Sequence, residues 1–128
     1  MSGQSTDTLP QGPTDLAEVE ATARDYIEGW YTGNVERMDR SLHRDLVKRF
    51  PGSTDPGSLG EVTKDRMLEL TANGGGDAPE TEVEILIDDV SSDIAAARVV
   101  SPDFLDYLQL AKTAEGWKIA NVLFHGRA

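Results

Sequence analysis

The 128-residue sequence contains no cysteine, only two histidines and no long apolar run. The absence of cysteine excludes disulfide bonds, thiolate nucleophiles and thiolate metal ligands, and it favours a reducing compartment. Two distant histidines without a spaced ligand pair on one helix predict no metal site. No stretch approaches the roughly 18 consecutive apolar residues of a membrane span.

Basic residues are also scarce. Twelve lysines and arginines stand against 23 acidic residues, which gives a formal net charge of −11 and a pI near 4.4. Such a negative field repels phosphate backbones and anionic lipid, so nucleic acid and membrane surfaces are excluded as expected partners. Residues 1–13 carry neither a basic residue nor an apolar run, so we expect no secretory signal or transit peptide and predict a cytoplasmic protein.

The length is typical of a single domain with one core. Residues 1–13 are rich in Ser, Gly, Thr, Gln and Pro and offer almost nothing to bury. We therefore expect a flexible tail over residues 1–13 and one ordered domain over residues 14–128.

Three stretches have the apolar spacing of amphipathic helices. The first begins near Thr14 and carries apolar residues three or four positions apart: Leu16, Val19, Ala23, Tyr26, Ile27 and Trp30. Asn34 can cap a second, shorter helix with one apolar face, formed by Val35, Met38 and Leu42. Thr63 opens a third helix, which ends at the glycine-rich residues 73–76.

The remaining sequence predicts strands. Residues 45–50 form a short strand, and the following loop contains Asp55-Pro56-Gly57, which excludes regular structure there. Four further strands follow, over residues 83–87, 94–100, 104–112 and 117–124. The order predicts an α+β fold, a conical barrel of a curved, mainly antiparallel sheet wrapped around three N-terminal helices. A pocket at its wide mouth is the expected functional site.

Several motifs, in order along the chain, resemble one known family. They are GWYTGN at 29–34, HRDLVKR at 43–49, AAARV at 95–99, DYLQL at 106–110 and GWKIANVLF at 116–124. Together they resemble the putative lumazine-binding family of the nuclear transport factor 2-like superfamily, which also holds ketosteroid isomerase-like and polyketide cyclase-like enzymes. The resemblance spans about Asp15 to His125. It implies a conical α+β barrel with a ligand cavity, frequently assembled as a homodimer.

Three residues are candidates for proton transfer. His43 lies where the second helix meets the first strand, and an imidazole titrates near neutral pH; the alternative is a helix-end histidine bonded to a carbonyl. Asp106 and Tyr107 adjoin within a strand, so only one of them faces the interior. An inward Asp106 would be a general acid or base, and an inward Tyr107 would donate to an oxyanion. The alternatives are an Asp106–Arg98 ion pair and a Tyr107 that fills the core.

Four residues are candidate ligand contacts. Trp30 and Tyr26 could belong to an aromatic wall, with plain core packing as the alternative. Arg98 lies in an alanine-rich strand, where it could bind an anionic ligand group or close an ion pair. Lys48 and Arg49 alternate across the first strand, so one of them faces inward. Arg49 is taken as the ligand contact, and a solvated edge charge is the alternative.

Three functions stay open at this point. The first is a small-molecule-binding domain whose internal cavity takes an apolar or aromatic metabolite. The second is a cofactor-independent isomerase, cyclase or dehydratase that uses His43 or Asp106 as its acid or base, and the third is a non-catalytic dimerisation module. We expect a small-molecule ligand, no cofactor, and a homodimer that forms through the outer face of the sheet.

Overall fold

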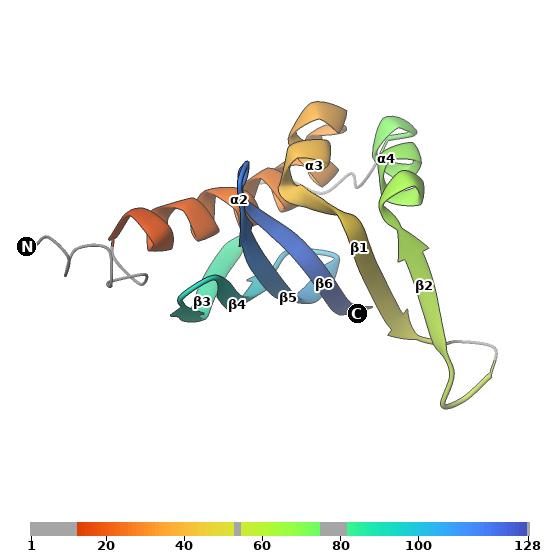
Figure 1. Cartoon of the computed structure of the whole chain (residues 1–128). Coiled ribbons are helices and arrows are strands. Elements are labelled where there is room, and N and C mark those ends of the chain that lie inside the picture. Colours follow the sequence, from red (N-terminus) through yellow and green to blue (C-terminus); the bar gives the residue numbers. More distant parts are fainter. Residues whose placement is uncertain (1–12, 53–54, 75–81, 128) are drawn as a thin grey trace, which may run out of the picture.

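The computed structural model describes residues 13–52, 55–74 and 82–127. Residues 1–12 of the predicted tail lie outside these ranges, and Pro13 is the first residue of the first described helix. The described chain forms three helices and a curved six-stranded sheet that does not close on itself (Figure 1). The predicted α+β class is confirmed. Within the described ranges, none of the helices combines the length and hydropathy that a bilayer crossing requires.

The helices lie close to their predicted positions: α2 (Pro13–Thr32), α3 (Val35–Ser41) and α4 (Lys64–Ala72). The Asn34 side chain accepts a hydrogen bond from the Arg37 backbone N–H at 3.1 Å, and Thr63 accepts one from the Arg66 N–H at 3.2 Å. Both predicted N-caps are therefore present. Leu16, in the first turn of α2, is 43% exposed and lies outside the buried stripe.

The strands are β1 (Leu42–Pro51), β2 (Leu59–Thr63), β3 (Glu84–Ser91), β4 (Ile94–Val100), β5 (Phe104–Thr113) and β6 (Gly116–Gly126). Their order in the sheet is β2-β1-β6-β5-β4-β3. The β1 and β6 strands pair in parallel, and every other neighbouring pair is antiparallel. The central β6 strand therefore joins the N-terminal β1–β2 hairpin to the C-terminal meander.

The β2 strand corrects the sequence prediction, which left this segment as a loop. Asp55-Pro56-Gly57 lies in the turn that reverses the chain, and β2 begins two residues later. It pairs with β1 from Val47↔Thr63 to Pro51↔Leu59. Gly60 lies opposite Phe50, and a side chain on Gly60 would collide with the Phe50 ring. A five-residue strand that contains a glycine gives only a weak alternating pattern.

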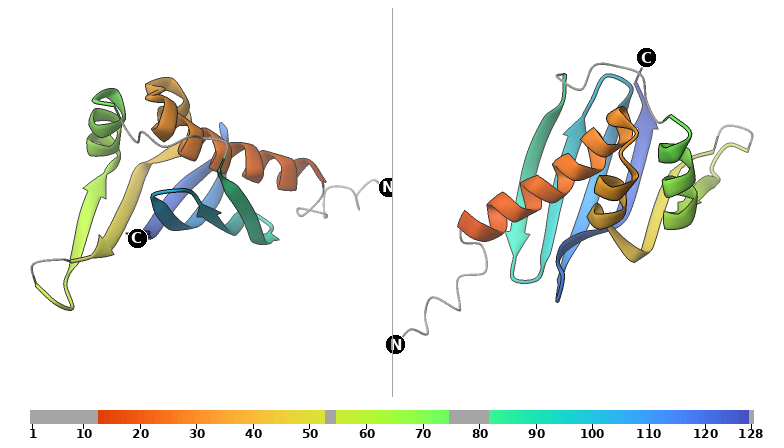
Figure 2. Two further views of the ribbon diagram at one scale, coloured as in Figure 1. Left: turned by 180° about the vertical axis from the view of Figure 1, so that it is seen from behind. Right: turned by 90° about the horizontal axis from the view of Figure 1, so that it is seen from above.

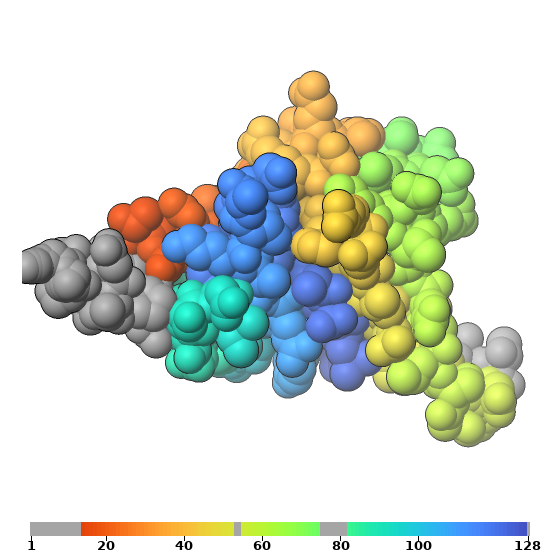
Figure 3. All heavy atoms as spheres, viewed as in Figure 1, coloured from red at the N-terminus to blue at the C-terminus, as the bar shows by residue number. Residues whose placement is uncertain are grey.

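The helices cover one face of the sheet. In Figure 2, α2 crosses the sheet diagonally, while α4 lies beside it over the β1–β2 end. The α2 helix packs against β3, β4 and β6, and α4 packs against β1 and β2. The core between these layers is apolar and includes Val19, Ile27, Met38, Leu108, Leu110 and Ile119. Figure 3 shows that the end of the β1–β2 hairpin projects beyond this compact body.

Asp15 fixes the start of α2 to the β5–β6 hairpin. Its carboxylate accepts hydrogen bonds from Trp117 Nε1 at 3.0 Å and from Lys112 Nζ at 2.9 Å. These two donors lower the pKa of Asp15 below its usual value. The contact joins residues about one hundred positions apart, so it closes the sheet against the helix that covers it.

Candidate functional site

A small pocket lies between the helices and the concave face of the sheet, with a volume of about 80 Å³. We call it the interior pocket. Its apolar wall comes from five elements and consists of Ile27, Trp30, Val62, Met67, Leu70, Phe104 and Phe124. Its polar lining consists of Tyr26, Lys48 and Asp106. An apolar hollow with a few convergent polar groups is the usual form of a ligand site.

The three polar residues form one hydrogen-bonded chain. Lys48 Nζ donates to the Tyr26 hydroxyl at 2.6 Å, and that hydroxyl donates to Asp106 Oδ1 at 2.9 Å. Lys48 is 8% exposed, and Tyr26 and Asp106 are each 2% exposed. A buried lysine and a buried carboxylate are thus joined through one phenol, which satisfies polar groups that would otherwise be costly to bury.

Sheet register explains why these groups meet. Lys48 of β1 lies opposite Val122 of β6, and Asp106 of β5 lies opposite Phe124, two residues further along β6. Residues two apart on a strand share a face, so Lys48 and Asp106 flank the same inward side of β6. Tyr26 comes from α2, which crosses this face.

Burial is the largest influence on the pKa values of Lys48, Tyr26 and Asp106. It raises the pKa of Asp106 above its usual value, although the charge of Lys48 and the hydrogen bond from Tyr26 act in the opposite direction. Burial also lowers the pKa of Lys48, and the charge of Asp106 opposes this shift. The pKa of Tyr26 is raised by burial and by Asp106. The charges of Lys48 and Asp106 therefore each stabilise the ionised form of the other residue. A carboxyl group with a raised pKa, such as that of Asp106, is suited to exchanging a proton with a molecule in the pocket.

An aromatic cluster lines the interior pocket beside the hydrogen-bonded residues Lys48, Tyr26 and Asp106. Trp30 and Phe104 meet edge to face with ring centroids 6.2 Å apart, and Phe104 and Phe124 do so at 5.6 Å. Lys48 Nζ lies 4.4 Å from the centroid of the Phe124 ring, within cation–π distance. Among the described residues, Trp30 Nε1 is the one buried side-chain nitrogen or oxygen atom that has no hydrogen-bond partner.

The structure separates Asp106 from Tyr107. Asp106 faces the interior pocket, whereas Tyr107 is 53% exposed on the opposite face of the sheet. Asp106 does not pair with Arg98, because Arg98 lies opposite Tyr107 and shares the outward side. Arg98 instead forms an ion pair with Asp88 of β3 at 2.9 Å.

Arg49 also points outward, where its guanidinium lies 3.5 Å from Glu61 of β2. The inward cation of this strand is Lys48. From the sequence, either Lys48 or Arg49 could face inward, and Arg49 was the predicted ligand contact. The signal that could have separated them is the position of Lys48 between Leu46 and Phe50, two apolar residues of the same strand face.

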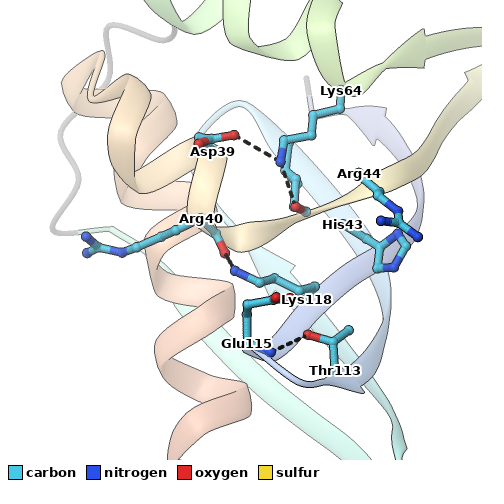
Figure 4. A pocket seen from close by; sticks show the side chains of 9 residues that line it. Asp39, Arg40, His43, Arg44, Lys64, Thr113, Glu115 and Lys118 are labelled. Carbon is cyan, nitrogen blue, oxygen red and sulfur yellow. Dashed lines mark hydrogen bonds and ion pairs between the residues drawn. The ribbon is translucent and has the colours of Figure 1, made fainter.

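His43 lines a different hollow, at the junction of α3, β1 and the β5–β6 hairpin (Figure 4). Its Nδ1 accepts a hydrogen bond from the Asp45 backbone N–H at 3.0 Å, not from a donor at the interior pocket. Two nearby lysines are already engaged, since Lys64 binds Asp39 at 2.9 Å and Lys118 donates to the Arg40 carbonyl at 2.6 Å. The structure therefore does not bring His43 together with Asp106.

The described residues contain no group of three or more His, Asp or Glu side chains placed to hold a metal ion. Residues 14–125 match the sequence family described as "Putative lumazine-binding". The chain belongs to this family.

Solved structures similar to this member of the putative lumazine-binding family share its fold at low sequence identity. An NTF2-like protein of unknown function from Shewanella baltica is 16% identical, with a TM-score of 0.72 over 90% of this chain and 95% of the other. One from Silicibacter pomeroyi is 17% identical, with a TM-score of 0.69 over 88% and 95%. A ketosteroid isomerase-like protein from Erwinia carotovora atroseptica is 19% identical, with a TM-score of 0.63 over 91% and 99%. The search of curated proteins gave no match.

Proposed function

We propose that the protein binds a small apolar molecule in the interior pocket, with Lys48, Tyr26 and Asp106 forming its polar end. The observation that carries this proposal is the buried polar chain on the wall of an otherwise apolar pocket. Apolar side chains at these buried positions would usually stabilise the fold as well as buried charged groups do or better. The presence of Lys48 and Asp106 therefore favours a role in binding. The family description is consistent with binding of a small molecule.

The pocket volume limits the ligand. A volume of about 80 Å³ is smaller than the roughly 150 Å³ of an engineered cavity that holds benzene. A compound with one small ring or a short aliphatic chain matches this space. A larger aromatic metabolite requires Met67 and Leu70 of α4 to move, and methionine adapts readily to such changes.

Thermal-shift measurements with a broad set of cyclic metabolites test this function. We expect at least one neutral compound to raise the melting temperature of the wild-type protein, since a ligand that binds only the folded state stabilises it. Leu70→Trp fills the pocket and should abolish the shift. Leu16→Trp places the same side chain on the exposed part of α2 and should preserve it. A set without any stabilising compound, or a shift that survives Leu70→Trp, contradicts the proposal.

A second candidate function is cofactor-independent proton transfer, as in an isomerase, cyclase or dehydratase. The observation that favours it is the Asp106 carboxyl, whose pKa is raised by burial and which faces the pocket. We assign the acid–base role to Asp106 alone, because His43 lines another hollow and Tyr107 faces outward. With a substrate in hand, Asp106→Asn should lower kcat by two or more orders of magnitude, and unchanged turnover removes the assignment.

We also propose a homodimer formed through the outer face of the sheet. Three large exposed apolar residues of this face, Leu59, Tyr107 and Leu123, line one shallow hollow of about 420 Å³. Contiguous exposed apolar surface of this kind typically marks a contact with another protein. The cytoplasmic location stays a prediction from the cysteine-free composition.

A further inference from the structure

Lys48 carries the amine of the interior pocket, and the proposed function uses it only as a polar contact. It is the one lysine that is buried among the described residues. Its Nζ lies 2.6 Å from the Tyr26 hydroxyl, 4.4 Å from the centroid of the Phe124 ring and 5.0 Å from that of the Tyr26 ring. Both residues line the pocket, so the amino end of the Lys48 side chain, and not only its stem, lies at the pocket wall.

Lys112 shows the opposite arrangement. It is exposed, and its Nζ meets the Asp15 carboxylate directly at 2.9 Å, so this hydrogen bond raises the pKa of Lys112. Lys48 reaches the carboxylate of Asp106 only through the Tyr26 hydroxyl, and burial lowers the pKa of Lys48. The fold therefore holds Lys112 as an ammonium and favours loss of the proton from Lys48.

The hydrogen-bonded chain offers a path by which Lys48 can lose this proton without releasing it to water. Lys48 Nζ donates to the Tyr26 hydroxyl, which donates to Asp106 Oδ1 at 2.9 Å. When each hydrogen bond passes its proton on, the ammonium and the carboxylate become a neutral amine and a neutral carboxylic acid, and Tyr26 stays a phenol. Burial favours both neutral forms, because it lowers the pKa of Lys48 and raises that of Asp106. A neutral, desolvated lysine amine is an activated nucleophile.

We propose that Lys48 forms a Schiff base with a small aliphatic aldehyde that binds in the interior pocket. This inference rests on the proposed function, because it names the chemical class that the same pocket binds. The apolar wall and the volume of about 80 Å³ suit a short carbon chain. An aldehyde carries no charge that the pocket would have to balance, and lysine amines form Schiff bases with carbonyl compounds.

The three polar residues supply every proton that this reaction moves. The lone pair of Lys48 Nζ attacks the carbonyl carbon, and one amine proton moves to the carbonyl oxygen, which gives a neutral carbinolamine. The acid proton of Asp106, passed through Tyr26, then turns the hydroxyl into leaving water while the nitrogen lone pair forms the C=N bond. Amine, carboxylic acid and aldehyde thus become iminium, carboxylate and water, so the pocket again holds one positive and one negative charge.

Reductive trapping of the full-length protein with propanal and sodium cyanoborohydride tests the adduct. The hydride reduces the imine and leaves a propyl group on the amine, and peptide mapping by mass spectrometry assigns this group to each lysine or to the terminal amino group. An ordinary lysine, with a pKa of about 10.4, is neutral in less than about 0.1% of molecules at pH 7. We therefore expect the initial rate at Lys48 to exceed that at Lys112 by roughly tenfold or more near neutral pH.

The pH dependence of the two rates tests the proton path. Lys112 loses its proton to water, so its neutral fraction rises roughly tenfold for each pH unit. Lys48 passes its proton to Asp106 inside the pocket, so its neutral fraction should change little between about pH 7.5 and 9. This range avoids the ordinary titration of histidine, since the exposed His125 also acts on Asp106. The ratio of the Lys48 rate to the Lys112 rate should therefore fall by roughly tenfold per pH unit.

Two matched tyrosine variants test the relay. Tyr26→Phe keeps the ring but removes the hydroxyl between Lys48 and Asp106, so the rate ratio should fall by roughly tenfold or more. Tyr31→Phe removes another buried phenol of α2, which donates to Ser101 Oγ at 3.0 Å, so the ratio should persist. The wild-type ratio and its pH dependence decide the inference by themselves if a variant does not fold.

The outcomes distinguish the inference from the function beneath it. Filling of the pocket is followed separately through the NMR signal of the Met67 methyl group, which lines it, with propanal and with the hydrocarbon cyclopentane. A Met67 shift without faster trapping at Lys48, a rate ratio that does not change with pH, or a ratio that survives Tyr26→Phe overturns the inference and leaves a binding pocket in place. No Met67 shift with either compound, together with no preferential trapping at Lys48, overturns the proposed function along with the inference.

Discussion

Lys48 and Arg49 are neighbours on β1 that have the same formal charge and opposite surroundings. Lys48 is buried between an aromatic ring and a phenol, whereas Arg49 lies on the outer face beside Glu61. The pleat of the strand produces this difference, because adjacent side chains point to opposite faces. The burial of Lys48 is tolerable because Asp106, reached through Tyr26, supplies an opposite charge.

Replacing Lys48 by methionine tests this compensation. The variant removes the charge that lowers the pKa of Asp106, so this pKa rises further above its usual value. An ionised Asp106 left without an opposite charge costs about 3 kcal/mol. This cost is present at neutral and higher pH and fades as the pH falls through the raised pKa, because the carboxyl is then protonated in the folded state. Urea unfolding of Lys48→Met should therefore show a deficit in unfolding free energy that shrinks on acidification.

Arg49→Met is the matched control for this prediction. It removes the adjacent cation of the same strand from an exposed site, so we expect a change in unfolding free energy of about 0.5 kcal/mol or less. Equal deficits for the two variants, or a Lys48→Met deficit that grows in acid, would show that Lys48 and Asp106 do not compensate each other.

The sequence did not predict which side chains of β4 and β5 face the interior pocket. The alternation rule established that only one of Asp106 and Tyr107 faces inward, but it did not say which. The register of β5 against β6 decides this, since Asp106 lies opposite Phe124 on the pocket side. Arg98 was uncertain for the same reason, because its partner Asp88 lies on a neighbouring strand whose register depends on an irregularity between Ile87 and Asp89.

At the scale of elements, the contact between α2 and α3 depends on the absence of a side chain at Gly29. A Cβ at this position would lie 3.1 Å from Met38 N and 3.2 Å from Asn34 O, and both are backbone atoms. Alanine gains about 1 kcal/mol of helix propensity over glycine. We predict that the close contact outweighs this gain, so that Gly29→Ala lowers the unfolding free energy by about 1 kcal/mol in chemical denaturation.

Ala21→Gly supplies the reference for this measurement. Ala21 is exposed on the same helix, so its replacement measures the propensity difference without a steric contribution. We expect a loss of about 1 kcal/mol. A Gly29→Ala protein that is stabilised by the amount Ala21→Gly loses would show that the two helices have room for a methyl group.

The anchor of α2 on the β5–β6 hairpin has its own pH dependence. The pKa of Asp15 is lowered by Lys112 and Trp117, so its ionised form stabilises the folded state above its usual titration range, and this contribution is lost as the pH falls. Asp15→Asn should lower the melting temperature at neutral pH by several degrees, and the difference from wild type should shrink progressively as the pH falls below about 4. Asp45→Asn, which changes an exposed carboxylate, should leave the melting temperature unchanged at both neutral and acidic pH. A difference in melting temperature between Asp15→Asn and wild type that persists in acid contradicts the assignment.

Most elements were predictable because their signals are local. Caps at Asn34 and Thr63, the apolar stripe of α2 and the short turns of the C-terminal meander are all visible within a few residues. The β2 strand was missed because its stability comes from pairing with β1 and from the Phe50 ring over Gly60. Neither contact is recorded in the five residues of the strand itself.

At the scale of the whole molecule, we propose that the outer face of the sheet forms the contact between two copies of the chain. Tyr107 and Leu123 lie directly opposite each other on β5 and β6 and are both about half exposed. We predict a particle of about twice the 13.9 kDa chain mass in light scattering. Leu123→Arg should shift it to the monomer because it buries a charge in the contact. Leu16→Arg, at an exposed apolar residue of α2, should leave the mass unchanged; a wild-type monomer at high concentration contradicts the dimer.

We propose that the ligand binds in the interior pocket. The two tryptophans report on it directly, because Trp30 lines the pocket and Trp117 is bonded to Asp15 at the far end of α2. In a titration with a neutral compound that raises the melting temperature, followed by ¹⁵N-resolved NMR, we predict a saturable shift of the Trp30 indole signal and a stationary Trp117 signal. A stationary Trp30 signal at saturating probe, or equal movement of both signals, would contradict the account.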